Sequence, residues 1–208
     1  MTVDTTVDTR ECASAIEDSP RIHIPADSAR LKGTLRLRNG KDVTVRPIRP
    51  DDARRLQAMH SRLSVDAIVN RFFRVVPRLT PEMAEHLTHL DYENRMALVA
   101  TTGEGEDEWI VGVVRYERIS PESAEVAFDV EDTWQGQGIS TSLLHMLAAY
   151  ARPRGFKTFV AVTMGSNIRM LDVLRHCGYP LTRKYMGSEV EVYLDITAPP
   201  QPAFAVSR

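Results

Sequence analysis

AEVAFDVEDTWQGQGIS, residues 124–140, passes from one kind of secondary structure to another around two glycines. Residues 124–130 are mostly apolar and predict a strand, whereas a helical run starts at Ser140. Gly136 and Gly138 stand between them, where backbone N–H groups and the first turn of a helix favour anions. Two glycines in such a place predict either a cradle for a phosphate or a turn that only needs positive φ.

The runs on either side of this stretch predict a single mixed α/β sheet with helices. Strands are expected at 34–48 as a hairpin around Asn39-Gly40, and at 96–102, 108–119, 124–130, 158–164 and 189–196. Helices are expected over 49–73 in one or two pieces, from Thr80 onward, over 140–155 and over 167–178. Because a helix joins 124–130 to 158–164, these two strands are expected to be parallel in a mostly antiparallel sheet.

Length and composition indicate one domain between two loose ends. The 208 residues are 43% hydrophobic, which suffices for one well-buried core and not for two ordinary domains with tails. Residues 1–30 are polar without periodicity and 197–208 are rich in Pro and Ala, so both are expected to be disordered. The domain is expected at 31–196.

Charge and cysteine content argue against several kinds of function. Lys and Arg number 26 against 28 Asp and Glu, so no net basic field favours nucleic acid or an anionic membrane. Cys12 and Cys177 form neither a disulfide framework nor a metal cluster, and the histidines lack metal-ligand spacing. No apolar run has the length of a membrane span or the pattern of a leader, so a cytoplasmic protein without a metal is expected.

Two common phosphate-binding motifs do not fit the glycines. A P-loop needs Gly-Lys-Ser/Thr, which does not follow Gly138. The dinucleotide motif G-x-G-x-x-G needs glycine where Thr141 stands. The turn therefore predicts a different phosphate-bearing ligand.

Three segments of the chain carry a resemblance to a known family. QGQGIS at 135–140 resembles the Gln/Arg-x-x-Gly-x-Gly/Ala signature of the GNAT superfamily of N-acetyltransferases, with Ser140 in the last position. VTVRPIRPDDARRL at 43–56 is similar to the family's first strand and helix, and NIRMLDVLRHCGY at 167–179 to its segment that runs from an asparagine through a leucine to Gly-Phe/Tyr. Residues 124–140, LSVDAIVNRFF and LDYENRMALVA resemble the acetyltransferase domain of bacterial protein-lysine acetyltransferases that modify acyl-CoA synthetases.

The resemblance implies the GNAT fold and a coenzyme A site built mainly from backbone. In the family the two central parallel strands splay, the pantetheine arm lies in the gap, and the pyrophosphate rests on the glycine turn. Carried onto this sequence, the expected cofactor-binding residues are Phe128, Asp129, Val130, Gly136, Gln137, Gly138, Ile139, Ser140, Thr141 and Asn167. Asn167 is also expected to cap the helix that it opens.

Glu125 is the candidate general base. A lysine amine has a pKa of about 10.4, so a base must remove its proton before it attacks a thioester at neutral pH. Glu125 lies within an apolar strand, where an acid is costly unless it faces a cleft or a partner, and it matches the family's strand-borne catalytic glutamate. The alternative is a plain position on the polar face of an alternating strand. Asp129 is expected to share that face as a second acid.

One position departs from the family at the residue that would protonate the departing thiolate of coenzyme A. Many members carry a tyrosine seven residues after the asparagine, and Leu174 stands there. We therefore expect the thiolate to leave unaided or to take its proton from water, since a thiol has a pKa of about 8.5.

These observations predict an enzyme that moves acetyl from acetyl-CoA to a primary amine by direct attack. The expected acceptor is a protein lysine, for instance on an acyl-CoA synthetase. A small-molecule amine is the alternative acceptor. A non-catalytic acyl-CoA-binding module is the alternative function, and Leu174 and Ser140 favour it.

Overall fold

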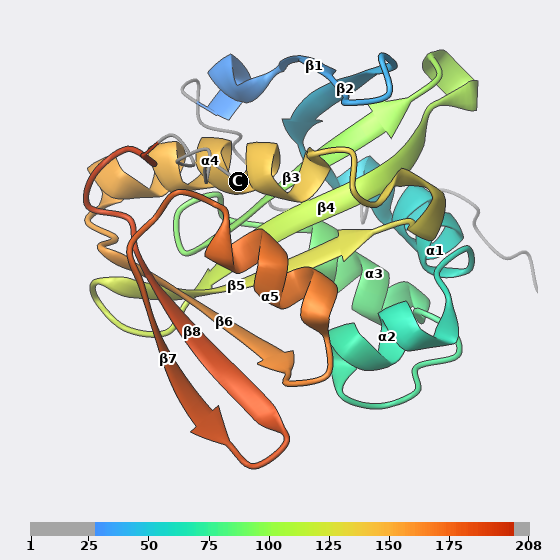
Figure 1. Ribbon diagram of the computed structural model, residues 1–208. Helices are drawn as coiled ribbons and strands as arrows, with labels where there is room; N and C mark the ends of the chain where they lie inside the picture. The colour runs from blue at the N-terminus through green and yellow to red at the C-terminus, as the bar shows by residue number, and fades with distance from the viewer. Residues whose placement is uncertain (1–27, 202–208) are drawn as a thin grey trace, which may run out of the picture.

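A computed structural model of the chain describes residues 28–201, which form an eight-stranded sheet covered by helices (Figure 1). The expected tails at 1–30 and 197–208 lie largely outside the described residues. The sheet order is β1-β2-β3-β4-β5-β6-β8-β7, and only β5 and β6 are parallel neighbours. The strands are β1 (Gly33–Arg36), β2 (Asp42–Pro47), β3 (Arg95–Thr102), β4 (Trp109–Arg118), β5 (Ser123–Val130), β6 (Thr158–Met164), β7 (Leu181–Met186) and β8 (Glu189–Asp195). The predicted mixed sheet is confirmed.

The helices are α1 (Ala53–His60), α2 (Val65–Phe72), α3 (Pro81–Thr88), α4 (Ile139–Ala151) and α5 (Ile168–Arg175). The helical run predicted at 49–73 is interrupted, because Ser64 begins a new helix by accepting a hydrogen bond from Ala67 N at 3.2 Å. Thr80 caps α3 in the same way, as the sequence predicted, with Met83 N at 3.3 Å. Among the described residues no helix is both long and apolar enough to cross a membrane.

The predicted hairpin at Asn39-Gly40 joins β1 to β2 and is confirmed. Gly40 has a φ of 81°, a left-handed conformation that glycine adopts without a steric cost. The side-chain oxygen of Asn39 accepts a hydrogen bond from Lys41 N at 3.0 Å, which closes the turn. The two strands then pair in antiparallel register, with Leu35 opposite Val43.

The core of the molecule lies on both faces of β3 and β4. The central residues of both strands are buried without alternation, as expected for strands that are covered on two sides. α4 packs on one face of these strands, while α1 and α3 lie on the other (Figure 1). β5 joins this covered part of the sheet through β4.

β5 and β6 are paired at one end and separate at the other. Their pairing covers Ser123–Glu125 against Thr158–Val160 and is parallel, as predicted. β5 then continues to Val130 and β6 to Met164 without further pairing between them. On this edge, the backbone of 126–130 has no partner among the described strands, so an extended molecule can hydrogen-bond to it.

β7 is the strand that the sequence did not reveal. It pairs antiparallel with β8, with Lys184 opposite Glu191, and it forms one edge of the sheet. Its sequence LTRKYM is mostly exposed, so the buried alternation that predicts a strand is missing. Basic side chains are typical of edge strands because they discourage pairing with other chains.

Candidate active site

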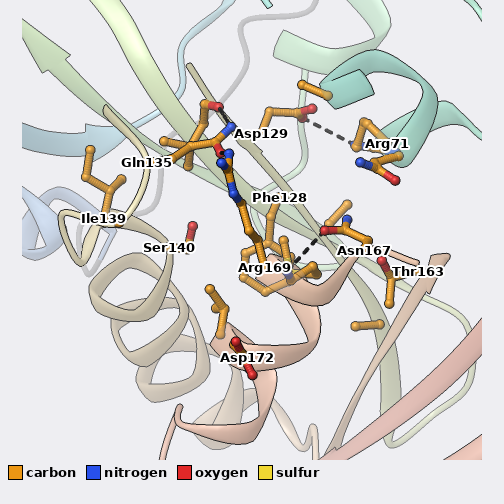
Figure 2. A pocket seen from close by; sticks show the side chains of 18 of the residues that line it. Arg71, Phe128, Asp129, Gln135, Ile139, Ser140, Thr163, Asn167, Arg169 and Asp172 are labelled. Atoms are coloured by element: carbon orange, nitrogen blue, oxygen red, sulfur yellow. Dashed lines mark hydrogen bonds and ion pairs between the residues drawn. The ribbon is translucent and has the colours of Figure 1, made fainter. Parts of the chain in front are cut away.

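A cleft of about 1150 Å³ opens where β5 and β6 separate. Its walls come from these two strands, from α2, from the turn before α4 and from the start of α5 (Figure 2). Glu125 lies where the pairing ends, and the glycine turn follows the other end of the open edge of β5. The cleft therefore joins the two features that the sequence singled out.

The glycine turn has the geometry of an anion cradle. Gly136 and Gly138 have φ values of 74° and 94°, a region that other residues rarely adopt. A Cβ at either position would meet no atom within 4 Å, so open space adjoins the turn. α4 begins directly afterwards at Ile139, where the N–H groups of its first turn have no partner within the helix. The turn thus both requires positive φ and leaves room for an anion.

Every predicted cofactor-binding residue lines this cleft except Gln137. Those that line it are Phe128, Asp129, Val130, Gly136, Gly138, Ile139, Ser140, Thr141 and Asn167. Gln137 is turned toward the hairpin instead. Its side-chain oxygen accepts a hydrogen bond from Asn39 N at 3.1 Å, and its carbonyl accepts one from Arg38 N at 3.3 Å. Gln137 therefore joins the cradle to the β1–β2 turn.

Two arginines beside the cradle were missed by the sequence reasoning. Arg38, next to the β1–β2 turn, donates to the carbonyl of Gly136 at 3.4 Å. Arg169, in the first turn of α5, donates to the side-chain oxygen of Gln135 at 2.9 Å and crosses the cleft toward it (Figure 2). Both line the cleft and bring positive charge to the place where an anion would lie. Arg38 belongs to no motif in this sequence, and Arg169 lies in the segment 167–179 at a position that the family pattern leaves unspecified, so only the fold shows that both lie near the glycines.

The two acids of β5 share one face of the sheet, as predicted, but their surroundings differ. Glu125 is exposed at the cleft and stands opposite Glu117 of β4. Asp129 is half-buried and forms an ion pair with Arg71 of α2 at 3.3 Å. Of these two acids, Glu125 is the one that faces the cleft without an ion pair to any of residues 28–201.

Arg115 lies buried next to this ion pair. Its side chain donates to the carbonyl of Leu87, in the last turn of α3, at 3.1 Å. Burial lowers the pKa of Arg115 to about 10, although the negative charge of Asp129 opposes the shift. The guanidinium stays protonated at neutral pH, so Asp129 has positive groups beside it on both α2 and β4.

Asn167 caps α5 as predicted, and nothing at position 174 can supply a proton. The side-chain oxygen of Asn167 accepts a hydrogen bond from Met170 N at 3.1 Å, so its amide N–H groups remain to donate into the cleft. Leu174 is fully buried and aliphatic. Cys177 is buried away from the cleft lining, and burial raises the pKa of its thiol, which makes it a poor nucleophile.

These groups fit a coenzyme A thioester. The cradle and the two arginines suit a pyrophosphate, because N–H groups and guanidinium groups both bind phosphate oxygens. The open edge of β5 suits an extended arm with amide groups, which needs backbone partners. Glu125 lies at the far end of this path, where the reactive end of such a molecule would lie.

Comparison with known proteins agrees with this site. The family described as the acetyltransferase (GNAT) domain matches residues 42–180. The chain belongs to this family. As a GNAT acetyltransferase it is an acyltransferase enzyme, and its sheet with one splayed parallel pair is the GNAT fold.

Relatives of this GNAT domain include bacterial acetyltransferases. One from Pseudomonas aeruginosa is 31% identical over 144 residues, which cover 69% of this chain and 77% of that protein. Acetyltransferase Pat of Mycolicibacterium smegmatis is 29% identical over 173 residues, which cover 81% of this chain but only 51% of Pat. The solved GNAT domain of S. lividans PAT has a TM-score of 0.75 at 34% identity, covering 83% of this chain and 99% of that domain.

Proposed function

We propose that this GNAT domain transfers acetyl from acetyl-CoA to a primary amine, with a protein lysine as the acceptor and Glu125 as the general base. The observation that carries the proposal is the place of Glu125. It lies where β5 and β6 part, at the opposite end of the open strand edge from the glycine turn. The base and the anion cradle are thus held on one strand and the turn that follows it.

Each part of the cleft has a role in this reaction. Bound acetyl-CoA supplies a thioester carbonyl that an amine can attack. Gly136, Gly138 and the start of α4 hold its pyrophosphate, while Arg38 and Arg169 neutralise charge there. The carboxylate of Glu125 takes the proton of the incoming ammonium, directly or through a water, so that the amine attacks as a neutral group. With leucine at position 174, the thiolate receives its proton from water.

A protein acceptor is favoured by the relatives. The chain is similar to acetyltransferase Pat of Mycolicibacterium smegmatis and to the GNAT domain of S. lividans PAT. Together with the resemblance of residues 124–140 to protein-lysine acetyltransferases, this supports a lysine as the acceptor. The cleft of about 1150 Å³ is open to solvent, so an amine can enter it beside the donor. An acyl-CoA synthetase is the first acceptor to test.

The test uses radiolabelled acetyl-CoA with three acceptors, namely a purified acyl-CoA synthetase, a lysine peptide and a mixture of small amines. Label on the synthetase or the peptide supports the proposal. Label on the small amines alone replaces the protein acceptor by a metabolite. Binding of acetyl-CoA by calorimetry without transfer to any acceptor would leave only a binding module.

A further inference from the structure

The β1–β2 turn contacts the glycine turn at one end of the cleft. Arg38 N and Asn39 N both donate to Gln137, to its carbonyl at 3.3 Å and to its side-chain oxygen at 3.1 Å. The guanidinium of Arg38 also donates to the carbonyl of Gly136 at 3.4 Å. The GNAT family match begins only at residue 42, so β1 and this turn lie outside it. Their contact with the glycines is a feature of this chain that the family match does not include.

The β1–β2 turn carries two cations that have no carboxylate partner within residues 28–201. Arg38 is exposed and lines the cleft. Lys41 is exposed as well, and its ammonium lies 5.4 Å from the ring centre of Trp134, which also lines the cleft. Arg36 of the same hairpin is different, because it is paired with Asp42 at 3.1 Å. The charges of Arg38 and Lys41 are therefore available to an anion from outside the chain.

The cleft walls that remain for the nucleotide of a donor differ in charge. A donor with its thioester at Glu125 and its pyrophosphate at the glycine turn extends past that turn with its nucleotide. The β1–β2 turn adds Arg38 to the cleft lining, whereas α5 adds the carboxylate of Asp172 (Figure 2). Arg169 of α5 also lines the cleft, but it is directed at Gln135 beside the pyrophosphate cradle. A further phosphate is thus favoured on the side of the β1–β2 turn.

We propose that Arg38 and Lys41 bind the 3′-phosphate of coenzyme A. The inference rests on the donor part of the proposed function and adds how the donor is recognised. A phosphate monoester carries nearly two negative charges at neutral pH and accepts hydrogen bonds from both guanidinium and ammonium groups. Because Gln137 already holds the β1–β2 turn, the cations are positioned before the donor binds. The turn therefore selects coenzyme A over a pantetheine donor that lacks this phosphate.

The test measures affinity by calorimetry for coenzyme A and for dephospho-coenzyme A, which lacks only the 3′-phosphate. The variants are Arg38→Ala with Lys41→Ala, and Lys41→Ala alone. Arg36→Ala is the matched control, because Arg36 is an exposed arginine of the same hairpin whose charge is paired and which does not line the cleft. Circular dichroism verifies that each variant is folded. Transfer from acetyl-CoA to a lysine peptide is measured separately, so that donor binding and acetyl transfer are judged apart.

The wild type should bind coenzyme A about tenfold more tightly than dephospho-coenzyme A. The double variant should bind the two ligands with nearly equal affinity, and Arg36→Ala should keep the tenfold difference. Lys41→Ala should reduce the difference, and it decides the matter if the double variant does not fold.

A wild type that binds both ligands equally, or a double variant that keeps the wild-type difference, would overturn the inference. A difference that depends on Arg38 and Lys41, in an enzyme that acetylates no acceptor, would uphold the phosphate contact and contradict the proposed function. A wild type that binds neither ligand would overturn both.

Discussion

The two edges of β5 meet different neighbours. Toward β4 the strand is paired along its length, from Ala124 with Arg118 to Val130 with Gly112. Toward β6 it is paired only at Ser123–Glu125 and then faces the cleft. The paired edge determines where each side chain of β5 points, and the open edge leaves backbone groups for a ligand.

This difference shows how a reactive acid can be placed without a loop. Val126 and Phe128 point into the core, while Glu125 and Asp129 share the other face. A shift of one residue against β4 would expose both apolar side chains, so the register is strongly held. Glu125 is therefore fixed by the burial of its neighbours in the chain.

The largest effect is expected from Glu125→Gln, which removes the proposed base at the point where the two edges begin to differ. kcat for acetyl transfer should fall by about 10²–10⁴-fold, because glutamine cannot accept the proton. Glu117→Gln is the matched control, since Glu117 stands opposite Glu125 on β4 but does not line the cleft. Steady-state rates with a lysine peptide measure both. A Glu125→Gln enzyme within a few-fold of wild type would show that another group is the base.

A smaller effect is expected from Gly112→Ala on the paired edge. A Cβ at Gly112 would lie 2.9 Å from the side chain of Ile139 and 3.4 Å from that of Val130. The free energy of unfolding should fall by about 1–3 kcal/mol, as for other overpacked sites. Because Ile139 begins α4, affinity for coenzyme A should fall as well. Urea unfolding measures the stability and calorimetry measures the affinity for coenzyme A. An unchanged midpoint of urea unfolding would mean that α4 can shift to accommodate the new methyl group without loss of stability.

Gly136→Ala tests the cradle beyond the open edge. The substitution should lower the free energy of unfolding by about 1 kcal/mol, because alanine is strained at positive φ. It should also weaken coenzyme A binding by at least about tenfold, since the new methyl group occupies the space that a phosphate needs.

Gly155→Ala is the control for that strain. Gly155 has a φ of 85° and open surroundings, but it does not line the cleft. The Gly155→Ala variant should lose a similar free energy of unfolding, measured by thermal unfolding. It should bind coenzyme A with the affinity of the wild type. Equal affinity losses in the two variants would contradict the cradle.

The smallest effect is expected from Ser140→Ala. The proposed contact of Ser140 with the cofactor uses its backbone N–H, which alanine retains. Affinity for coenzyme A by calorimetry should stay within about twofold of wild type. A large loss of affinity would mean that the hydroxyl group binds the cofactor. Serine in place of the family's glycine or alanine would then have a function.

The elements that the sequence predicted are those with a strong local signal. Asn39-Gly40, the Thr80 cap and the apolar runs of β3, β4 and β6 each determine their structure within a few residues. β7 has mostly exposed side chains without an alternation of buried and exposed positions that favours a strand, and it forms by pairing with β8, which no local pattern records. The sequence left open whether residues 49–73 form one helix or two, since both helices have helical periodicity and only the cap at Ser64 separates them.

The candidate site divides in the same way. The glycines and Asn167 belong to short motifs and Glu125 stands out as an acid within an apolar strand, so the sequence could single out residues that the structure places in one cleft. Arg38 is 98 residues from Gly136 in the chain, and its approach depends on the whole sheet between them. The sequence also could not show whether the side chain of Gln137 points into the cleft or away from it. That direction depends on the contact between the glycine turn and the β1–β2 turn.

The contact between the hairpin and the cradle makes the amide of Asn39 a natural reporter. Its N–H donates to the side chain of Gln137, within the glycine turn, yet Asn39 does not line the cleft. In a ¹⁵N-labelled sample, the chemical shift and the exchange rate of this single proton should respond when the turn adjusts around an anion. The state of the site can then be followed by NMR from outside it, with no probe attached to any residue that a ligand touches.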